Sequence, residues 1–293
     1  MSTSQTTVFE RFDCGVVAVD GPDAVSYLQS LVSQDLAPLA DGDSTRSLLL
    51  QPQGKLTAVF GLLRLSDESV LLYTDEGFGA ALAEALTRFR IRVKVEIVDR
   101  SDTWGVLSVR GEAAGALAAA VTAPVHVVAA DWPTVRGADL IGSIDSLAAA
   151  RDQLVAGGAE VGSVDTYERL RIEAGVPRQG VDINEKTIPQ EAFLERDTVS
   201  FTKGCFLGQE LVCRIDTRGH VNKYLRRLEL HDAVPDLGAD VVAGDRSVGT
   251  ITSVAATPGG AVALATLRKE VEPPATVDVR WGDVSAEAAV TSV

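Results

Sequence analysis

The spacing of apolar and polar positions predicts a mixed first half of the chain. Apolar residues recur at helical spacing within residues 21–36 and 79–89, while short apolar runs at 46–51, 56–65 and 69–74 predict strands. Helices and strands therefore alternate irregularly. The pattern favours an α+β fold over a doubly wound parallel sheet.

The pattern changes in the second half. A helix is predicted from Val164 to Ala174, with Ser163 as its N-cap and Gly175 as its stop. Residues 176–207 show little periodicity, and a connection of this length is usually functional or disordered. After Arg227, short strands alternate with glycine turns. This alternation predicts a small antiparallel barrel or sandwich.

Composition and charge limit the number of domains and the classes of partner. The chain has 293 residues, which is enough for two or three domains, and a formal net charge of −14. The negative charge argues against broad, charge-driven binding of nucleic acid or acidic membranes. No apolar run approaches the ~20 residues of a membrane span, and the N-terminal residues lack a secretory pattern. We expect a cytoplasmic protein with neither a membrane nor a direct nucleic-acid partner.

One of the three cysteines lies in an unusual place. Cys205 lies between Gly204 and Gly208, just ahead of a short helix predicted over Gln209–Thr217. The free N–H groups and the dipole at a helix N-terminus favour a thiolate, and the nearby cation of Lys203 adds to this effect. The alternative is that Cys205 is a small buried filler, as most free cysteines are. The other two, Cys14 and Cys213, are expected in the core.

The same segment carries a surplus of positive charge. Between residues 203 and 227 there are six basic side chains and two acidic ones. This surplus indicates a site for a polyanionic ligand or an RNA backbone, although these side chains could equally point into solvent. The chain contains no dinucleotide or P-loop motif, and its three histidines are too scattered to predict a metal site.

The octapeptide "KGCFLGQE", residues 203–210, resembles the signature of the YgfZ family of folate-binding proteins. The resemblance extends to "GPDAVSYLQSLVSQDL", to the hairpin "LLQPQGKLTAVFGLLR", to "RLRIEAGVPRQGVDI" and "IPQEA", and to "VGTITS" and "ALATLR" near the C-terminus. These stretches occur in the family's order and cover nearly the whole chain. Leu207 is a minor departure from the signature.

The resemblance implies the fold of the glycine-cleavage T-protein superfamily. That fold has two interleaved α+β subdomains, here expected in residues 1–225, and a C-terminal β-barrel, here expected in 226–293. Its parts form a ring around a central folate-binding channel. The family binds tetrahydrofolate and supports assembly or repair of iron–sulfur clusters in a subset of enzymes, including tRNA-modifying ones, through its signature cysteine. The partners implied are folate and iron–sulfur client or assembly proteins, and we expect a monomer.

The resemblance also supplies candidate site residues. Glu173 corresponds to a glutamate that grips the pterin ring in the T-protein. From the local surplus of positive charge, Arg214, Arg218 and Lys223 are our candidates for the glutamate tail. The full set comprises Cys205 and Lys203 for the chemistry, and Glu173, Gln190, Glu191, Gln209, Glu210, Arg214, Arg218 and Lys223 for the folate. No metal ligand is predicted.

One departure separates the chain from the aminomethyltransferase. Where that enzyme carries an Asp-Asp pair in its hairpin, this chain has Ala58 and Val59. Without a carboxylate there is no evident group to handle the proton of the folate amine, so aminomethyl transfer is not expected. The alternatives left open are a folate-dependent one-carbon transferase similar to the T-protein, in which Cys205 is incidental, or binding of another pterin- or flavin-like ring.

Overall fold

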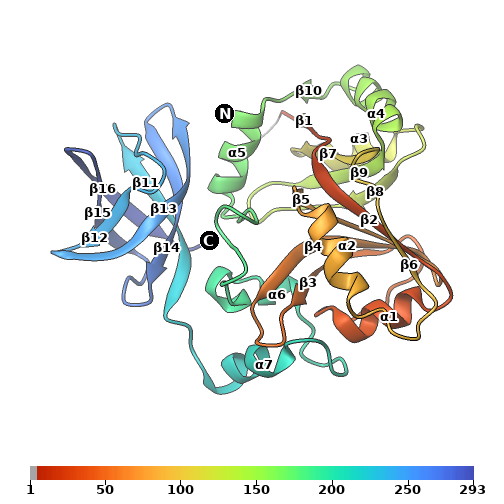
Figure 1. Ribbon diagram of the computed structural model, residues 1–293. Coiled ribbons are helices and arrows are strands. Elements are labelled where there is room, and N and C mark those ends of the chain that lie inside the picture. The colour runs from red at the N-terminus through yellow and green to blue at the C-terminus, as the bar shows by residue number, and fades with distance from the viewer. Residues whose placement is uncertain (1–4) are drawn as a thin grey trace. The chain divides into compact units, whose positions relative to one another are not determined.

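The computed structural model describes residues 5–293, which form two compact units (Figure 1). Unit 1 comprises the chain up to Gly162 together with Arg196–Leu211, and unit 2 comprises Ser163–Glu195 together with Val212–Val293. The chain therefore passes between the units three times.

Unit 1 contains two five-stranded sheets. The first has the strand order β10-β1-β7-β9-β8 and the second the order β3-β4-β5-β2-β6. The strands are β1 (Thr7–Arg11), β2 (Cys14–Asp20), β3 (Ser44–Leu50), β4 (Leu56–Ser66), β5 (Ser69–Glu76), β6 (Glu96–Asp99), β7 (Trp104–Arg110), β8 (His126–Ala129), β9 (Gly137–Ser143) and β10 (Glu160–Val161). Because β1 joins the sheet of β7–β10 while β2–β6 form the other, the chain interleaves two α+β halves. The predicted fold class is confirmed.

Four helices cover these sheets. Buried side chains of α1 (Ala24–Leu31) and α2 (Gly79–Thr87) share one apolar cluster with the second sheet. Those of α3 (Ala114–Ala119) and α4 (Ile144–Ala156) share another with the first sheet. A third cluster combines residues of both sheets. Since alternate residues of a strand point to opposite faces, unit 1 is layered helix, sheet, sheet, helix.

Unit 2 contains a closed six-stranded antiparallel barrel, as predicted for the C-terminal region. Its strands, in the order β11-β14-β13-β12-β15-β16, are β11 (Lys223–His231), β12 (Asp240–Ala243), β13 (Arg246–Thr257), β14 (Gly260–Arg268), β15 (Ala275–Trp281) and β16 (Val284–Thr291). The first barrel strand thus begins three residues before the predicted boundary. The division into folding domains at 225/226 stays a prediction.

The remaining helices lie between the sheets and the barrel in sequence: α5 (Val164–Glu173), the 3-10 helix η1 (Pro189–Ala192), α6 (Glu195–Thr198) and α7 (Gln209–Arg218). Helix α5 begins as predicted, because the Ser163 side chain accepts a hydrogen bond from the Thr166 N–H. It ends at Glu173, one residue before the predicted Ala174, and the predicted stop Gly175 has a φ of +71°. None of the helices in residues 5–293 is both long and apolar enough to cross a bilayer.

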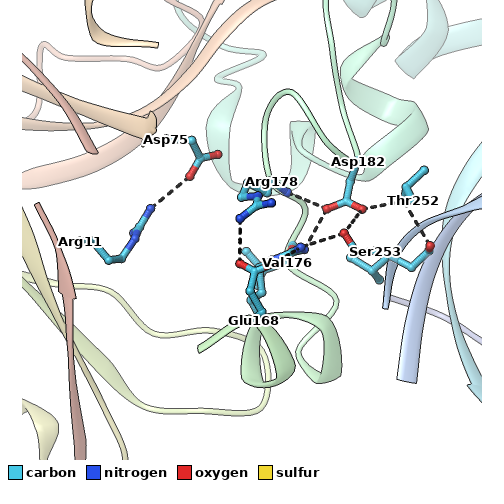
Figure 2. Close-up of polar contacts among 10 residues, drawn as sticks. Arg11, Asp75, Glu168, Val176, Arg178, Asp182, Thr252 and Ser253 are labelled. Atoms are coloured by element: carbon cyan, nitrogen blue, oxygen red, sulfur yellow. Dashed lines mark hydrogen bonds and ion pairs between the residues drawn. The ribbon is translucent and has the colours of Figure 1, made fainter. Parts of the chain in front are cut away.

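A buried carboxylate joins α5, the connection after it and the barrel. The Asp182 side chain has 0% exposure, and its Oδ2 accepts hydrogen bonds from Arg171 at 2.8 Å and from the backbone N–H of Arg178 at 3.0 Å. Its Oδ1 accepts from the hydroxyls of Thr252 at 2.6 Å and Ser253 at 2.7 Å (Figure 2). Helix α5 and the connection after it are thereby tied to strand β13.

Replacement of Arg171 by methionine tests this network. The change leaves the Asp182 carboxylate buried without a countercharge, so we expect a loss of about 3–5 kcal/mol in the free energy of unfolding. Urea denaturation followed by circular dichroism measures it. The matched control is Arg169→Met, which breaks the partly exposed pair with Glu173 and should cost no more than about 1 kcal/mol. Equal losses in the two variants would contradict the assigned role of Arg171.

Candidate functional site

Cys205 lies on a loop of unit 1 whose neighbouring side chains turn inward. Cys205 is exposed, whereas the next residue, Phe206, is only 7% exposed. Leu207 packs against the apolar cluster formed by α1, α2 and the second sheet. The loop is therefore held by the residues after the cysteine, and the thiol is left accessible. Helix α7 starts at Gln209, so the prediction that Cys205 precedes a helix N-terminus is confirmed.

Two local hydrogen bonds close this loop. The backbone N–H of Lys203 donates to Ser200 Oγ at 3.2 Å, and the backbone N–H of Phe206 donates to Gln209 Oε1 at 3.1 Å. Gln209, a candidate for binding folate, thus has a partner within the loop itself.

The Lys203 side chain ties the loop to helix α1. Its Nζ donates to the backbone carbonyls of Gln29, Val32 and Gln34, each at 2.8 Å. These carbonyls lie at the C-terminal end of α1, where the helix dipole favours a cation. An ammonium has three donors, and all three are engaged here. Burial lowers the pKa of Lys203 from 10.5 to about 8.

Two glycines explain why the signature and the hairpin occur together. Gly208 has a φ of +77°, and a Cβ added there would lie 2.4 Å from the carbonyl oxygen of Gln51. Gly54, in the hairpin turn, has a φ of +73°, and its added Cβ would lie 2.7 Å from Leu211 Cβ. Only glycine fits at either position without displacing backbone or a packed side chain. The hairpin turn therefore supports the start of α7 directly.

Glu173, the candidate for binding the pterin, is the last residue of α5 in unit 2. Its Oε1 lies 3.2 Å from an Arg169 nitrogen, and its side chain is 37% exposed. Arg227 Nη1 donates to the Glu173 carbonyl oxygen at 2.5 Å. Two cations thus offset the negative end of the helix dipole and the carboxylate. Glu173, Arg227 and His231 line a cavity of about 230 Å³, so Glu173 is not a freely solvated surface acid.

Three other candidates in unit 2 have partners within that unit. Glu191 Oε2 accepts from the Ile188 N–H at 3.1 Å, which caps η1, and lies 3.7 Å from Lys223 Nζ. Gln190 is 8% exposed, and its Nε2 donates to the Val212 carbonyl oxygen at 2.9 Å. Structural roles are therefore evident for Gln190 and Glu191.

Apart from Gln209, the candidates on α7 are exposed. Glu210 is in the first turn, and Arg214 and Arg218, four residues apart, share a face of the helix. The prediction that Cys213 lies in the core is wrong: it is only partly buried, because the neighbouring Val212 takes the fully buried position. Desolvation raises its pKa.

Cys14 behaves as predicted from the sequence. It is 1% exposed within the cluster between the two sheets of unit 1, and burial raises the pKa of its thiol to about 12. An inert, protonated thiol is the consequence. Among the three cysteines, only Cys205 is exposed.

The structure groups the candidates into separate sets. Lys203, Cys205 and Gln209 share one loop of unit 1, while Glu191 and Lys223 form an ion pair in unit 2. Arg171 and Asp182 are not among the candidates predicted from the sequence. Both lie within the stretch "RLRIEAGVPRQGVDI", and a buried charge pair is not visible from local periodicity.

Comparison with known proteins places these features in a family. The model of the GCVT N-terminal domain family matches residues 3–151. The chain is 27% identical to the tRNA-modifying protein YgfZ of Klebsiella pneumoniae, over 94% of this chain and 89% of that protein. It is 31% identical to the human mitochondrial iron–sulfur cluster assembly factor IBA57, over 76% of this chain and 66% of that protein.

A solved structure shows the same fold. The glycine cleavage system aminomethyltransferase T from Bartonella henselae superposes with a TM-score of 0.86, covering 99% of this chain and 86% of that one at 21% identity. The barrel, the paired sheets and the matched domain thus agree with the resemblance carried by the signature. The chain belongs to the GCVT N-terminal domain family, and it is similar to YgfZ proteins.

Proposed function

We propose that the chain is a tetrahydrofolate-binding accessory protein that supports assembly or repair of iron–sulfur clusters, acting through Cys205. The observation that carries the proposal is the exposed thiol on a loop fixed at Lys203, Phe206 and Leu207. A fixed loop that leaves its thiol accessible suits a reactive cysteine better than a packing cysteine. The similarity to a protein named an iron–sulfur cluster assembly factor supports the same role.

Folate binding is proposed to depend on Glu173. A carboxylate offers two parallel acceptors to the adjacent N–H and amino donors of a pterin ring. Glu173 lines a cavity of about 230 Å³ and its side chain is partly accessible, which favours a binding role over a purely structural one. For the glutamate tail we propose Arg214, Arg218 and Lys223. Anaerobic titration with tetrahydrofolate, against other pterins and flavins, tests the ligand.

Aminomethyl transfer is the second candidate function, favoured by the likeness in fold to an aminomethyltransferase. Ala58 and Val59 argue against it. Both are buried in strand β4, with 2% and 9% exposure, and neither carries a group that could exchange a proton. The accessory role, in the cytoplasm and with iron–sulfur proteins as partners, therefore remains the proposal.

Lys203 is proposed to position Cys205 instead of reacting itself. Its three donors are engaged by carbonyls at the end of α1, so the ammonium holds the loop in place. The field of Asp35 favours the charged lysine, and Phe206 lies with its ring centroid 5.7 Å from Nζ.

Cys205→Ala tests the role of the thiol. Since the side chain is exposed, the free energy of unfolding should change by no more than about 0.5 kcal/mol. Iron–sulfur enzyme activity should be lost in cells that depend on this protein. Cys213→Ala, which removes the partly buried thiol, is the control and should retain that activity. A stable Cys205→Ala protein with full cellular activity would contradict the proposed role of the thiol.

Glu173→Gln tests the pterin contact. Replacing one acceptor oxygen by a donor should weaken tetrahydrofolate binding by about 1.5–3 kcal/mol, the range for hydrogen bonds to charged groups. Isothermal titration under anaerobic conditions measures the affinity. Glu270→Gln, an exposed acid outside the cavity, should bind as the unmodified protein does. Undiminished affinity in Glu173→Gln would exclude this contact.

Lys203→Met tests the positioning role through pH. Between about pH 8 and pH 10.5 the unfolded chain keeps the Lys203 proton that the folded protein has lost. The unfolded state then binds more protons, so stability relative to the methionine variant should rise with pH across this window and stay level below it. Urea unfolding from pH 6 to 10 gives the difference.

The same variant should also loosen the loop. Hydrogen exchange of the amides in residues 200–207 should speed up at neutral pH, because the three bonds to α1 are lost. Lys94→Met, an exposed lysine, is the control for loss of a charge. Unchanged exchange together with a pH-independent stability difference would contradict the role assigned to Lys203.

A further inference from the structure

Two adjoining cavities in unit 2 lie on the outer face of the barrel. The larger, of about 560 Å³, and the smaller, of about 190 Å³, share Glu191, Lys223 and Thr266 as lining residues. The smaller one is bounded on the other side by the connection that includes Val181–Asn184. We call the two together the barrel groove.

The barrel groove brings two cations together. Lys223 on β11 lies directly opposite Arg268 on β14, and both line the larger cavity. Side chains directly opposite on antiparallel strands are about 4.5–5.5 Å apart at Cβ, and like charges placed so are destabilising. Within a chain of net charge −14, such a pair is unexpected unless something compensates it.

The protein itself compensates this pair only in part. Glu191 Oε2 is 3.7 Å from Lys223 Nζ, which is too far for a direct hydrogen bond. The Arg268 side chain makes no hydrogen bond or ion pair with the residues that the structure describes, 5–293. The donors of Lys223 and Arg268 that face the groove are therefore available to a ligand.

The rest of the groove is polar but adds no free negative charge. Thr266, Thr250 and Thr252 line the smaller cavity, where the Thr252 hydroxyl already donates to Asp182. The one other carboxylate there, Asp182, is neutralised by Arg171 at 2.8 Å. Hydroxyls can donate to an oxyanion while the two cations supply the charge.

We propose that the barrel groove binds an oxyanion, a carboxylate or phosphate group, between Lys223 and Arg268, with Thr266 as a third donor. An arginine offers two parallel donors to such a group, and the lysine a third charge-assisted bond. The cavity is larger than one oxyanion, so the ligand extends beyond it. This proposal rests on the proposed function, which makes the glutamyl tail of the folate the carrier of the bound oxyanion. A free phosphate compound is the alternative carrier.

The experiment measures four probes by calorimetry on the full chain: tri-γ-glutamate alone, inorganic phosphate alone, and tetrahydrofolate with one or with three glutamates. Arg268→Met should weaken binding of the oxyanion probe roughly tenfold and reduce the advantage of three glutamates over one. Affinity for the monoglutamate should change little. Arg280→Met, on strand β15 of the same barrel and paired with Asp278, is the control.

Each outcome has a definite meaning. Binding of tri-γ-glutamate that Arg268→Met weakens and Arg280→Met does not supports the groove with the tail as its source. The same pattern with phosphate only supports a free phosphate compound. No saturable binding of either probe, or equal weakening by both variants, overturns the proposal. If a probe binds but tetrahydrofolate does not, the oxyanion site in the barrel groove is supported and the proposed folate function is contradicted.

Discussion

The buried carboxylate of Asp182 is the constraint on which unit 2 depends. A charge taken out of water is costly unless a countercharge and hydrogen bonds replace the lost hydration. Here Arg171 supplies the charge from α5, while Thr252 and Ser253 supply hydroxyls from β13. Because these donors come from elements far apart in the sequence, the carboxylate can be buried only when helix and barrel are assembled together.

In unit 1 the desolvated charge is positive, and the same need for replacement of its hydration applies. The Lys203 ammonium is desolvated, and backbone carbonyls at the end of α1 take the place of water. This arrangement fixes the loop while leaving Cys205 outside. The charged end of the Lys203 side chain thus anchors the loop, and the Cys205 thiol two residues later is exposed. The proposed function of Cys205 would therefore depend on an interaction that does not touch the thiol.

Much of the secondary structure follows from local pattern. Helix α5 has its cap at Ser163 and its stop at Gly175 because both effects act within a few residues. The local pattern gave wrong or missing elements where contacts with residues distant in the sequence determine the structure. The helix expected over 21–36 ends at Leu31, since Val32 is extended and pairs with Leu49. Strand β9 and helix α4 were not predicted, because β9 is buried on both faces and shows no alternation.

The sequence by itself determined the α+β class, the barrel and the chemical identity of the candidate nucleophile, Cys205, because motif and periodicity are local properties. It did not determine the partners of charged side chains. Lys203 meets carbonyls some 170 residues earlier in the chain, and Lys223 meets Arg268 only through the register of β11 and β14. Such pairs are fixed by the register of the strands and by the path of the chain through the fold. Neither can be predicted from a short stretch of sequence. The tertiary structure alone therefore decided that Lys203 is an anchor and that two cations share a groove.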